Sequence, residues 1–498
     1  MSSRERQKNS SEKTARKDRA AEVANTFEWL ITGFILALLF MTFVMQAFRI
    51  PTGSMADTLM GDHFRLRCWQ CGYKYDHGHP QNYNPRRPLK RTYTRCPSCG
   101  HYQQTAAAMS IANGDRILVL KCIYQFLEPK RWDVIVFKNP LDPAINYIKR
   151  LVGRPGETVE IIDGDIYING QISRKPPKVQ DELWMPVYDN DYQPIRPEVP
   201  AFNRHIWRQP FDIANSEWTI PENNPTKFSL DSPAEQINAM TYDSSIGNDF
   251  RATYAYDDVG GFEYMPYCSD LMVRFYVDPT ESYGRIGIAL SKYQTAYSAW
   301  VDSTGDMVIA ETSKGQETIV DSKLIEPLAA NKPTLVKFAN VDHQLIFQVG
   351  DEKLTHDLGR GPEDAGPRRT DIQPQVKIFG AGKLTLSHIA IFRDIHYTAK
   401  VLRTGKPFKF KLEKDEFFVL GDNSPNSADS RMWAKKGIGI DGKPLYREGI
   451  VPREYLVGKA LFVYWPSGFR LHLGRTKSRL AVVPNVGRMR FIYGGSNR

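Results

Sequence analysis

The chain has 498 residues, of which 41% are hydrophobic and 24% charged, so it is too long for one core and two to four domains are expected. Its formal net charge of +10 would suit nucleic acid, but the basic residues gather at both ends and near residues 85–95, without a nucleic-acid-binding motif. We therefore expect no nucleic acid and instead a membrane surface, whose anionic headgroups attract lysine and arginine.

The N-terminus predicts a membrane anchor. Residues 1–25 are polar and basic and are expected to form a disordered cytoplasmic arm. Residues 26–48 are predicted to form a transmembrane helix, because the 20 residues from Trp29 to Phe48 carry no charge and would span roughly 30 Å. A cleaved signal peptide is the alternative, but its apolar core is shorter, about 7–15 residues, and Gln46-Ala-Phe-Arg is a poor cleavage site. The positive-inside rule then predicts a single-pass protein of the cytoplasmic membrane, with its N-terminus in the cytoplasm and everything after Arg49 outside.

Two hydroxyl residues follow the apolar run closely, near the expected bilayer surface. Ser54 comes directly after Gly53, and Thr52 lies two places before the serine. Glycine allows another part of the backbone to approach closely. A Gly-Ser pair by itself mostly marks a turn, so a catalytic interpretation of Ser54 depends on the rest of the chain.

Residues 64–100 contain two Cys-x-x-Cys pairs, each followed by glycine: Cys68, Cys71, Cys96 and Cys99. Four thiolates at this spacing are typical of a zinc ribbon, since tetrahedral Zn²⁺ takes four soft ligands. Two disulfides are the alternative, because the segment is expected outside the cytoplasm. A Cys-x-x-Cys disulfide is strained, so we favour a structural zinc, which four thiolates would leave without an open position. Cys122 and Cys268 are expected to be buried thiols.

Residues 101–170 predict antiparallel strands. Apolar or alternating runs separated by turn signals stand at Gly114–Lys121, Arg131–Lys138, Asn146–Gly153 and 158–170. Lys149 is flanked by apolar residues in the third of these runs. From the pattern alone, a lysine in that setting is expected to point to solvent from an edge strand.

The second half of the chain changes pattern twice. Residues 171–235 are rich in proline and asparagine and are expected to be an irregular linker, whereas residues 236–404 hold many short alternating strands, the pattern of an antiparallel β-sandwich. Residues 405–466 return to the first pattern, with a strand ending in the polar loop Gly421–Trp433. Such a loop is usually solvated, but its hydroxyls, carboxylates and arginine leave room for a site. Residues 467–498 form a basic C-terminal tail.

Five segments in this order resemble bacterial signal peptidase I, a membrane-anchored serine protease that removes signal peptides. They are Ile50-Pro-Thr-Gly-Ser-Met55, Gly114-Asp-Arg-Ile-Leu-Val-Leu-Lys121, Asp133-Val-Ile-Val-Phe137, Tyr147-Ile-Lys-Arg150 and the Gly421–Arg431 loop. The resemblance covers residues 26–62, 112–170 and 405–466. It implies a mostly β protein whose antiparallel catalytic domain comprises residues 49–63, 101–170 and 405–466, with a zinc-ribbon-like insertion and a sandwich insertion. The sandwich pattern resembles laminin-G or concanavalin-like folds, which carries little functional weight.

The resemblance also implies roles for individual residues. Ser54 would be the nucleophile and Lys149 its general base, which needs desolvation because a lysine normally holds its proton up to about pH 10.4. Ser427 would hydrogen-bond Lys149, and the oxyanion would be met by the Ser54 backbone N–H and the Thr52 hydroxyl. Asp429 and Arg431 would form a supporting ion pair.

The family's substrate is an extended peptide of an exported preprotein, with small residues at the first and third positions before the cut. The resemblance places its shallow apolar pockets at Phe48, Ile50, Pro51, Leu59, Tyr147 and Ile148. No cofactor is expected for catalysis. Two positions depart from the family pattern: Asp57 replaces a proline, and Ser424 replaces an arginine.

The sequence leaves rivals to this interpretation. One is a membrane-anchored envelope-binding protein whose sandwich binds glycan or protein, and the intact set of Ser54, Lys149 and Ser427 argues against it. The other is a specialised peptidase whose clients are selected by the sandwich. The sequence does not identify those clients.

Overall fold

The computed structural model describes residues 22–79, 92–104, 111–199, 206–359, 372–398, 408–439, 441–470, 482–483 and 485–495. Most of the expected cytoplasmic arm and part of the basic C-terminal tail lie outside these residues. The described chain is mostly β-structure, as predicted, and all pairings between its strands are antiparallel. Most strands expected between residues 114 and 170 are present, with bounds shifted by a few residues.

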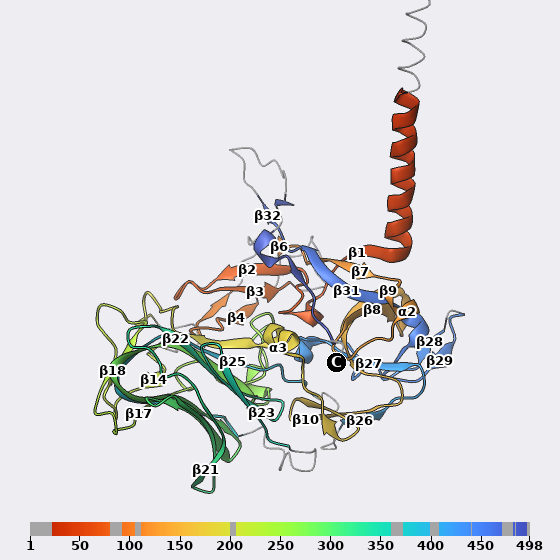
Figure 1. Cartoon of the computed structure of the whole chain (residues 1–498). Helices are drawn as coiled ribbons and strands as arrows, with labels where there is room; N and C mark the ends of the chain where they lie inside the picture. Colours follow the sequence, from red (N-terminus) through yellow and green to blue (C-terminus); the bar gives the residue numbers. More distant parts are fainter. Residues whose placement is uncertain are drawn as a thin grey trace, which may run out of the picture.

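One helix among the described residues, Glu22–Val44, is long and apolar enough to cross a membrane. It stands clear of the rest of the molecule in Figure 1 and ends in the π-helical turn η1 (Phe40–Val44). The chain then continues directly into strand β1 (Met45–Arg49), which pairs with β7. The remaining helices are short: α2 (Ile123–Phe126), α3 (Pro177–Leu183) and the 3₁₀ turns η2 (Gly53–Met55), η3 (Phe262–Tyr264), η6 (Ser424–Asn426), η7 (Arg453–Tyr455) and η8 (Val486–Arg488).

The main sheet joins strands from both ends of the chain, in the order β1-β7-β31-β8-β9-β27-β30, with β34 beside β31. Its strands after β1 are β7 (Arg116–Leu120), β8 (Val134–Asn139), β9 (Asp142–Gly153), β27 (Glu416–Leu420), β30 (Val451–Pro452), β31 (Leu456–Trp465) and β34 (Arg490–Phe491). The second half of β9 and all of β27 are buried, as expected for interior strands rich in apolar residues. Their pairing places the loop after Leu420 next to Lys149 and Arg150.

A second, four-stranded sheet contains the strands that come directly before and after the long insertion in the chain. It consists of β10 (Thr158–Ile162), β11 (Asp165–Ile168), β12 (Gln171–Ile172) and β26 (Phe408–Lys411). Because β10 pairs with both β11 and β26, the chain leaves this sheet after β12 and returns to it more than 230 residues later. The insertion is thereby tied to this four-stranded sheet at both ends.

The insertion forms the largest sheet assembly, seen at the lower left of Figure 1. Two long strands, β18 (Leu271–Lys292) and β25 (Val376–Arg393), pair along most of their length. The other strands are β13 (Met185–Asp189), β14 (Phe211–Asp212), β15 (Trp218–Thr219), β16 (Phe228–Asp231), β17 (Asn238–Tyr242), β19 (Thr295–Asp302), β20 (Asp306–Ser313), β21 (Gln316–Leu324), β22 (Thr334–Val341), β23 (Gln344–Val349) and β24 (Glu352–Asp357). Its core is an apolar cluster that runs from Val187 to Ile391.

The segment 171–235 is more regular than the linker that the sequence predicts. It contains α3 and strands β13 to β16, and β13 and β16 pair directly with β25. These strands have only two to five residues, too few to establish a period of two in the sequence. β13 and β16 are stabilised by pairing with a long strand that is distant in the sequence, whereas β14 pairs with β17 and β15 with β16.

The cysteine-containing segment forms two small sheets beside the main sheet. They comprise β2 (His63–Arg67), β3 (Lys74–Gly78) and β6 (Ile111–Ala112), and β4 (Tyr93–Arg95) with β5 (Tyr102–Gln104). The four cysteines are in the centre of the apolar cluster of this segment. Two further strand pairs complete the described chain: β28 (Gly437–Ile438) with β29 (Pro444–Tyr446), and β32 (Phe469–Arg470) with β33 (Val482–Val483).

Candidate active site

Ser54 and Lys149 meet in the interior of the protein. The Lys149 ammonium donates hydrogen bonds to Ser54 Oγ at 2.7 Å and to the carbonyl of Ile148 at 2.9 Å. The two side chains are only 8% and 3% exposed, respectively. Lys149 does not point to solvent from an edge strand, because β9 lies between β8 and β27 in the main sheet. The arrangement joins a hydroxyl that can become a nucleophile to an amine that can accept its proton.

Burial changes the acid–base chemistry of Lys149. Loss of hydration disfavours its charged form and lowers the pKa of Lys149 from 10.5 to about 8. The carboxylates of Asp429 and Asp422 oppose this change, while Arg431 adds to it. A substantial fraction of Lys149 is therefore neutral at mildly alkaline pH, as a general base requires.

Residues 50–60, here called the nucleophile segment because they contain Ser54, include a single 3₁₀ turn. Thr52 has an extended backbone and is followed by η2, in which Gly53, Ser54 and Met55 are all buried. The hydroxyl oxygens of Thr52 and Ser54 are 3.5 Å apart, so the two hydroxyls lie side by side in the candidate site. A side chain at position 53 would collide with the ring of Tyr256, which explains the need for glycine there.

The polar loop after β27 comes within contact distance of Ser54. The backbone N–H of Asn423 donates to the Ser54 carbonyl at 3.1 Å. Gly421 is required at the contact, since a Cβ there would lie 2.2 Å from Ser427 Oγ and 2.4 Å from the Ser54 carbonyl oxygen. The structure therefore brings Ser54, Lys149 and Ser427 into one site.

Ser427 differs in detail from its expected role. Its hydroxyl is buried and makes no hydrogen bond to Lys149, whose donors go to Ser54 and Ile148 instead. The Ser427 hydroxyl instead acts on the charge of Asp429. Burial alone would raise the pKa of Asp429, but Arg431, the Gly421 amide and the Ser427 hydroxyl hold it below its ordinary value.

Asp429 and Arg431 form a buried ion pair, with Nε–Oδ1 and Nη2–Oδ2 distances of 2.9 and 2.6 Å. Arg431 also donates to the Ser424 hydroxyl at 2.7 Å and to the Ser424 carbonyl at 2.9 Å. The serine that departs from the family pattern is thus an acceptor for this arginine. The same hydroxyl accepts the backbone N–H of Thr398, close to the point where the described part of the insertion ends.

A second buried ion pair was missed in the sequence. Arg150 donates to both carboxylate oxygens of Asp422, at 2.8 and 2.7 Å, and both side chains are fully buried. Thr58 Oγ1 also contacts Asp422, which links the nucleophile segment to the same pair. The signal was available, because Arg150 follows Lys149 directly and Asp422 opens the polar loop. Arg150 lies inside an apolar strand and Asp422 lies just after one, so both are expected to be buried, and a buried charge needs a partner.

The six expected substrate-binding residues differ in accessibility. Ile50 and Leu59 are almost completely buried in an apolar cluster on which Phe48 and Ile148 also pack. Tyr147 is half-buried in the neighbouring cluster, and Pro51 is exposed. Ile50 and Leu59 therefore form the floor beneath the site, which leaves the other four as the accessible apolar surface.

The four paired cysteines are placed close enough to bind one metal ion. Their sulfur atoms lie within 4.8 Å of one another, and the Cys68–Cys99 and Cys71–Cys96 distances are both 3.6 Å. These distances are far from a disulfide bond of about 2.05 Å and close to the roughly 3.8 Å between sulfurs around a tetrahedral zinc. Gly72 and Gly100 have φ values of 76° and 73°, which closes each Cys-x-x-Cys turn. Of the other two cysteines, Cys268 is buried as expected, whereas Cys122 is partly exposed.

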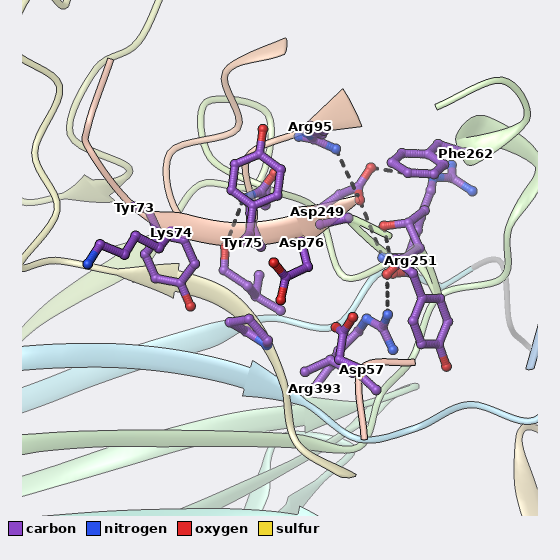
Figure 2. Close-up of a pocket in the computed structure, with 18 of the residues that line it drawn as sticks. Asp57, Tyr73, Lys74, Tyr75, Asp76, Arg95, Asp249, Arg251, Phe262 and Arg393 are labelled. Atoms are coloured by element: carbon purple, nitrogen blue, oxygen red, sulfur yellow. Dashed lines mark hydrogen bonds and ion pairs between the residues drawn. The ribbon is translucent and has the colours of Figure 1, made fainter. Parts of the chain in front are cut away.

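A pocket of about 260 Å³ lies beside the nucleophile segment, between the cysteine-containing segment and the insertion. In Figure 2, Asp57 and Asp76 extend into it from opposite sides, with Arg393 next to Asp57. Burial, and then the charges of Asp76 and Asp257, raise the pKa of Asp57 to about 7. The peptide bond that precedes Asp57 is cis. The position that departs from the family pattern therefore faces a pocket that the two insertions help to form.

Part of the chain is similar to signal peptidases. Residues 99–203 and 391–465 match the sequence profile of the family described as signal peptidase, peptidase S26. These ranges include Lys149 and the polar loop, while Ser54 lies before them. Signal peptidase I of Rickettsia canadensis is 31% identical over 144 residues, which cover 28% of this chain and 42% of the relative. For Rickettsia typhi the values are 31% over 134 residues, 27% and 39%, so the chain spans less than half the length of these curated relatives.

Solved structures match the chain only distantly. A carbohydrate-binding module, CBM66 from Bacillus subtilis, aligns with 37% of this chain and 96% of its own length, at 10% identity and a TM-score of 0.25. The galectin LEC-6 from Caenorhabditis elegans covers 26% of this chain and 87% of its own, at 14% identity and a TM-score of 0.20.

Proposed function

We propose that this protein is a membrane-bound serine endopeptidase that cleaves signal peptides from exported preproteins. The observation that carries the proposal is the 2.7 Å hydrogen bond between a buried Lys149 ammonium and Ser54 Oγ. The similarity of residues 99–203 and 391–465 to signal peptidases supports the choice of substrate. Residues 49–63, 101–170 and 405–466 are the proposed catalytic domain.

In the proposed mechanism, neutral Lys149 takes the proton of Ser54 as Oγ attacks the carbonyl carbon of the scissile bond. The carbonyl oxygen becomes an oxyanion, which accepts hydrogen bonds from the Ser54 backbone N–H and the Thr52 hydroxyl. Lys149 then gives its proton to the leaving amine, and the C–N bond breaks. Lys149 then takes a proton from water, which attacks the resulting ester; the bond between the carbonyl carbon and Oγ breaks, Lys149 returns the proton to Ser54 Oγ, and the signal peptide leaves with a free carboxylate.

The long apolar helix Glu22–Val44 supports a membrane-bound location for this reaction. We propose that its N-terminus faces the cytoplasm and that the catalytic domain lies outside, where exported chains emerge. β1 follows the helix directly, so Phe48 and the site are held close to the membrane that also retains the substrate's signal segment. A small-x-small sequence before the cut would suit the shallow apolar surface of Phe48, Tyr147 and Ile148.

Incubation of the purified, detergent-solubilised chain with a labelled preprotein tests the proposal. We expect one cut, after a small-x-small sequence, and mass spectrometry of the products locates it. A preprotein altered to a large residue immediately before the cut is the control and should remain intact. The absence of any cut in the unaltered preprotein would contradict the proposed function.

The rate of cleavage should rise with pH through the pKa of Lys149. Since only neutral Lys149 can act as the base, we expect kcat/KM to increase about tenfold per pH unit below about 8 and to level off above it. Asp57, whose pKa is raised to about 7, is an acid near the site that titrates in the same pH range. The Asp57→Asn variant should keep the same rising limb. A limb centred near 7 that disappears in that variant would assign the titration to Asp57 instead.

We also propose that Cys68, Cys71, Cys96 and Cys99 hold a structural zinc ion. We expect about one equivalent of zinc per purified chain by elemental analysis, and a lower melting temperature after a strong chelator removes it. Alkylation of the denatured, unreduced chain in chelator should modify all six cysteines. Modification of only two would favour the disulfide alternative and contradict a thiolate zinc site.

A further inference from the structure

A loop of the insertion reaches into the candidate active site. The loop lies between β17 and β18 and includes Tyr254, Tyr256 and Asp257, far in sequence from both Ser54 and the polar loop. Tyr254 and Tyr256 belong to one buried cluster with Ala56 and Met60 of the nucleophile segment. The contacts of this loop give the insertion a direct connection to the site.

Tyr256 supports the nucleophile segment from one side. Its ring occupies the space that a side chain at Gly53 would fill, and its hydroxyl donates to the carbonyl of Asp62 at 3.0 Å. The backbone of the same residue accepts a hydrogen bond from the Gly78 amide at 2.7 Å. The turn that holds Ser54 therefore packs directly against an aromatic ring of the insertion.

Asp257 holds the polar loop from the other side. Its Oδ1 accepts hydrogen bonds from the side-chain amides of Asn423, at 2.9 Å, and Asn426, at 3.1 Å. Asn423 precedes η6 and Asn426 is its last residue, directly before Ser427; the backbone N–H of Asn423 is the donor to the Ser54 carbonyl. Tyr254 adds a third contact, because its hydroxyl donates to the carbonyl of Asp422 at 3.0 Å.

The cysteine-containing segment forms hydrogen bonds to the backbone of the same loop. The carbonyl of Ala255 accepts the hydroxyl of Thr94 at 2.9 Å and lies 2.9 Å from His77 Nδ1. The loop is thus held between this segment and the two halves of the candidate site, which limits its freedom to move relative to Ser54.

We propose that Tyr256 and Asp257 are positioning residues, through which the insertion holds Ser54 in line with Lys149. The proposal rests on the proposed peptidase function. Asp257 accepts a hydrogen bond from the Asn423 side chain, and the Asn423 backbone donates one to the Ser54 carbonyl. Tyr256 packs against Gly53, the residue before Ser54. Loss of either contact leaves the lysine unchanged but lets the serine turn shift, so the chemical step slows while substrate binding is retained.

The experiment compares Asp257→Ala, Asp257→Asn and Asp258→Ala in the full-length chain, with kcat and KM for a labelled preprotein. We expect Asp257→Ala to lower kcat by roughly tenfold, because a charge-assisted hydrogen bond is lost. KM should stay within about twofold of the wild-type value. Asp257→Asn should restore most of kcat, because both donors use the single oxygen Oδ1 and an amide oxygen can replace it. Asp258, whose carboxylate accepts backbone amides of Gly260 and Tyr93, is the matched control and should keep the wild-type kcat.

A fall in kcat that disappears when rates are corrected for the folded fraction, measured by thermal melting, would overturn the positioning role. An unchanged kcat in Asp257→Ala, or no rescue by asparagine, would also overturn it. If the wild-type chain cleaves and Ser54→Ala does not, these outcomes reject only this inference. Absence of cleavage by the wild-type chain rejects the proposed function and this inference with it. The Tyr256→Ala variant supplies an independent measurement and should also lower kcat at unchanged KM.

Discussion

Alanine at Ser54 or at Lys149 is expected to lower kcat for preprotein cleavage by about 10⁴-fold or more. Without Ser54 the nucleophilic hydroxyl is lost, and without Lys149 the hydrogen-bond partner that remains for Ser54 Oγ among the described side chains is the Thr52 hydroxyl, which is not a base. Because serine and lysine act as one unit, the double variant should be no slower than the worse single variant. The measurement is the rate of product formation from a labelled preprotein under single-turnover conditions.

Lys409→Ala provides the matched control for Lys149→Ala. Lys409 lies on β26 of the neighbouring sheet, its side chain is 65% exposed, and it pairs with Glu160 at 3.3 Å. Its removal should leave the rate unchanged. Cleavage at near the wild-type rate by Ser54→Ala or Lys149→Ala, with the cut at the same position, would show that the roles are wrongly assigned.

Removal of the Asp422 carboxylate is expected to cause the largest loss of stability. The Asp422→Ala variant leaves the Arg150 guanidinium without its partner at a position with no solvent access, a loss of about 3–5 kcal/mol. The contact with Thr58 is lost at the same time, so the nucleophile segment should loosen as well. Denaturant unfolding of the detergent-solubilised chain, followed by tryptophan fluorescence, measures the change.

A surface ion pair supplies the comparison for this prediction. Asp415 pairs with Arg453 at 2.6 Å, but these side chains are 49% and 35% exposed, so Asp415→Ala should cost no more than about 1 kcal/mol. Combining Asp422→Ala with Arg150→Met should recover part of the loss, because the uncompensated charge is removed. If Asp422→Ala costs no more than Asp415→Ala, the buried pair does not contribute in the way that its geometry indicates.

Several features of the protein could be predicted because they depend on neighbouring residues. The uncharged run before Arg49, the alternation in the strands and the two Cys-x-x-Cys pairs are local patterns, and each has a counterpart in the structure. Ser54 and Lys149 were selected from the sequence through their motifs, although they are 95 positions apart. The short strands β13 and β16 were missed, since their pairing with the distant β25 leaves no local pattern.

The sequence by itself determined the kinds of residue that the site contains, a long apolar helix before them and a mostly β fold around them. Only the tertiary structure decided that Lys149 is buried rather than solvent-facing, that Arg150 pairs with Asp422, and that Asp257 binds Asn423 across 166 positions. The physical reason is that burial and pairing depend on which distant strands and loops pack together. A lysine in an apolar strand has the same sequence whether a neighbouring strand covers it or water does, and that difference is the largest cause of the lowered pKa of Lys149.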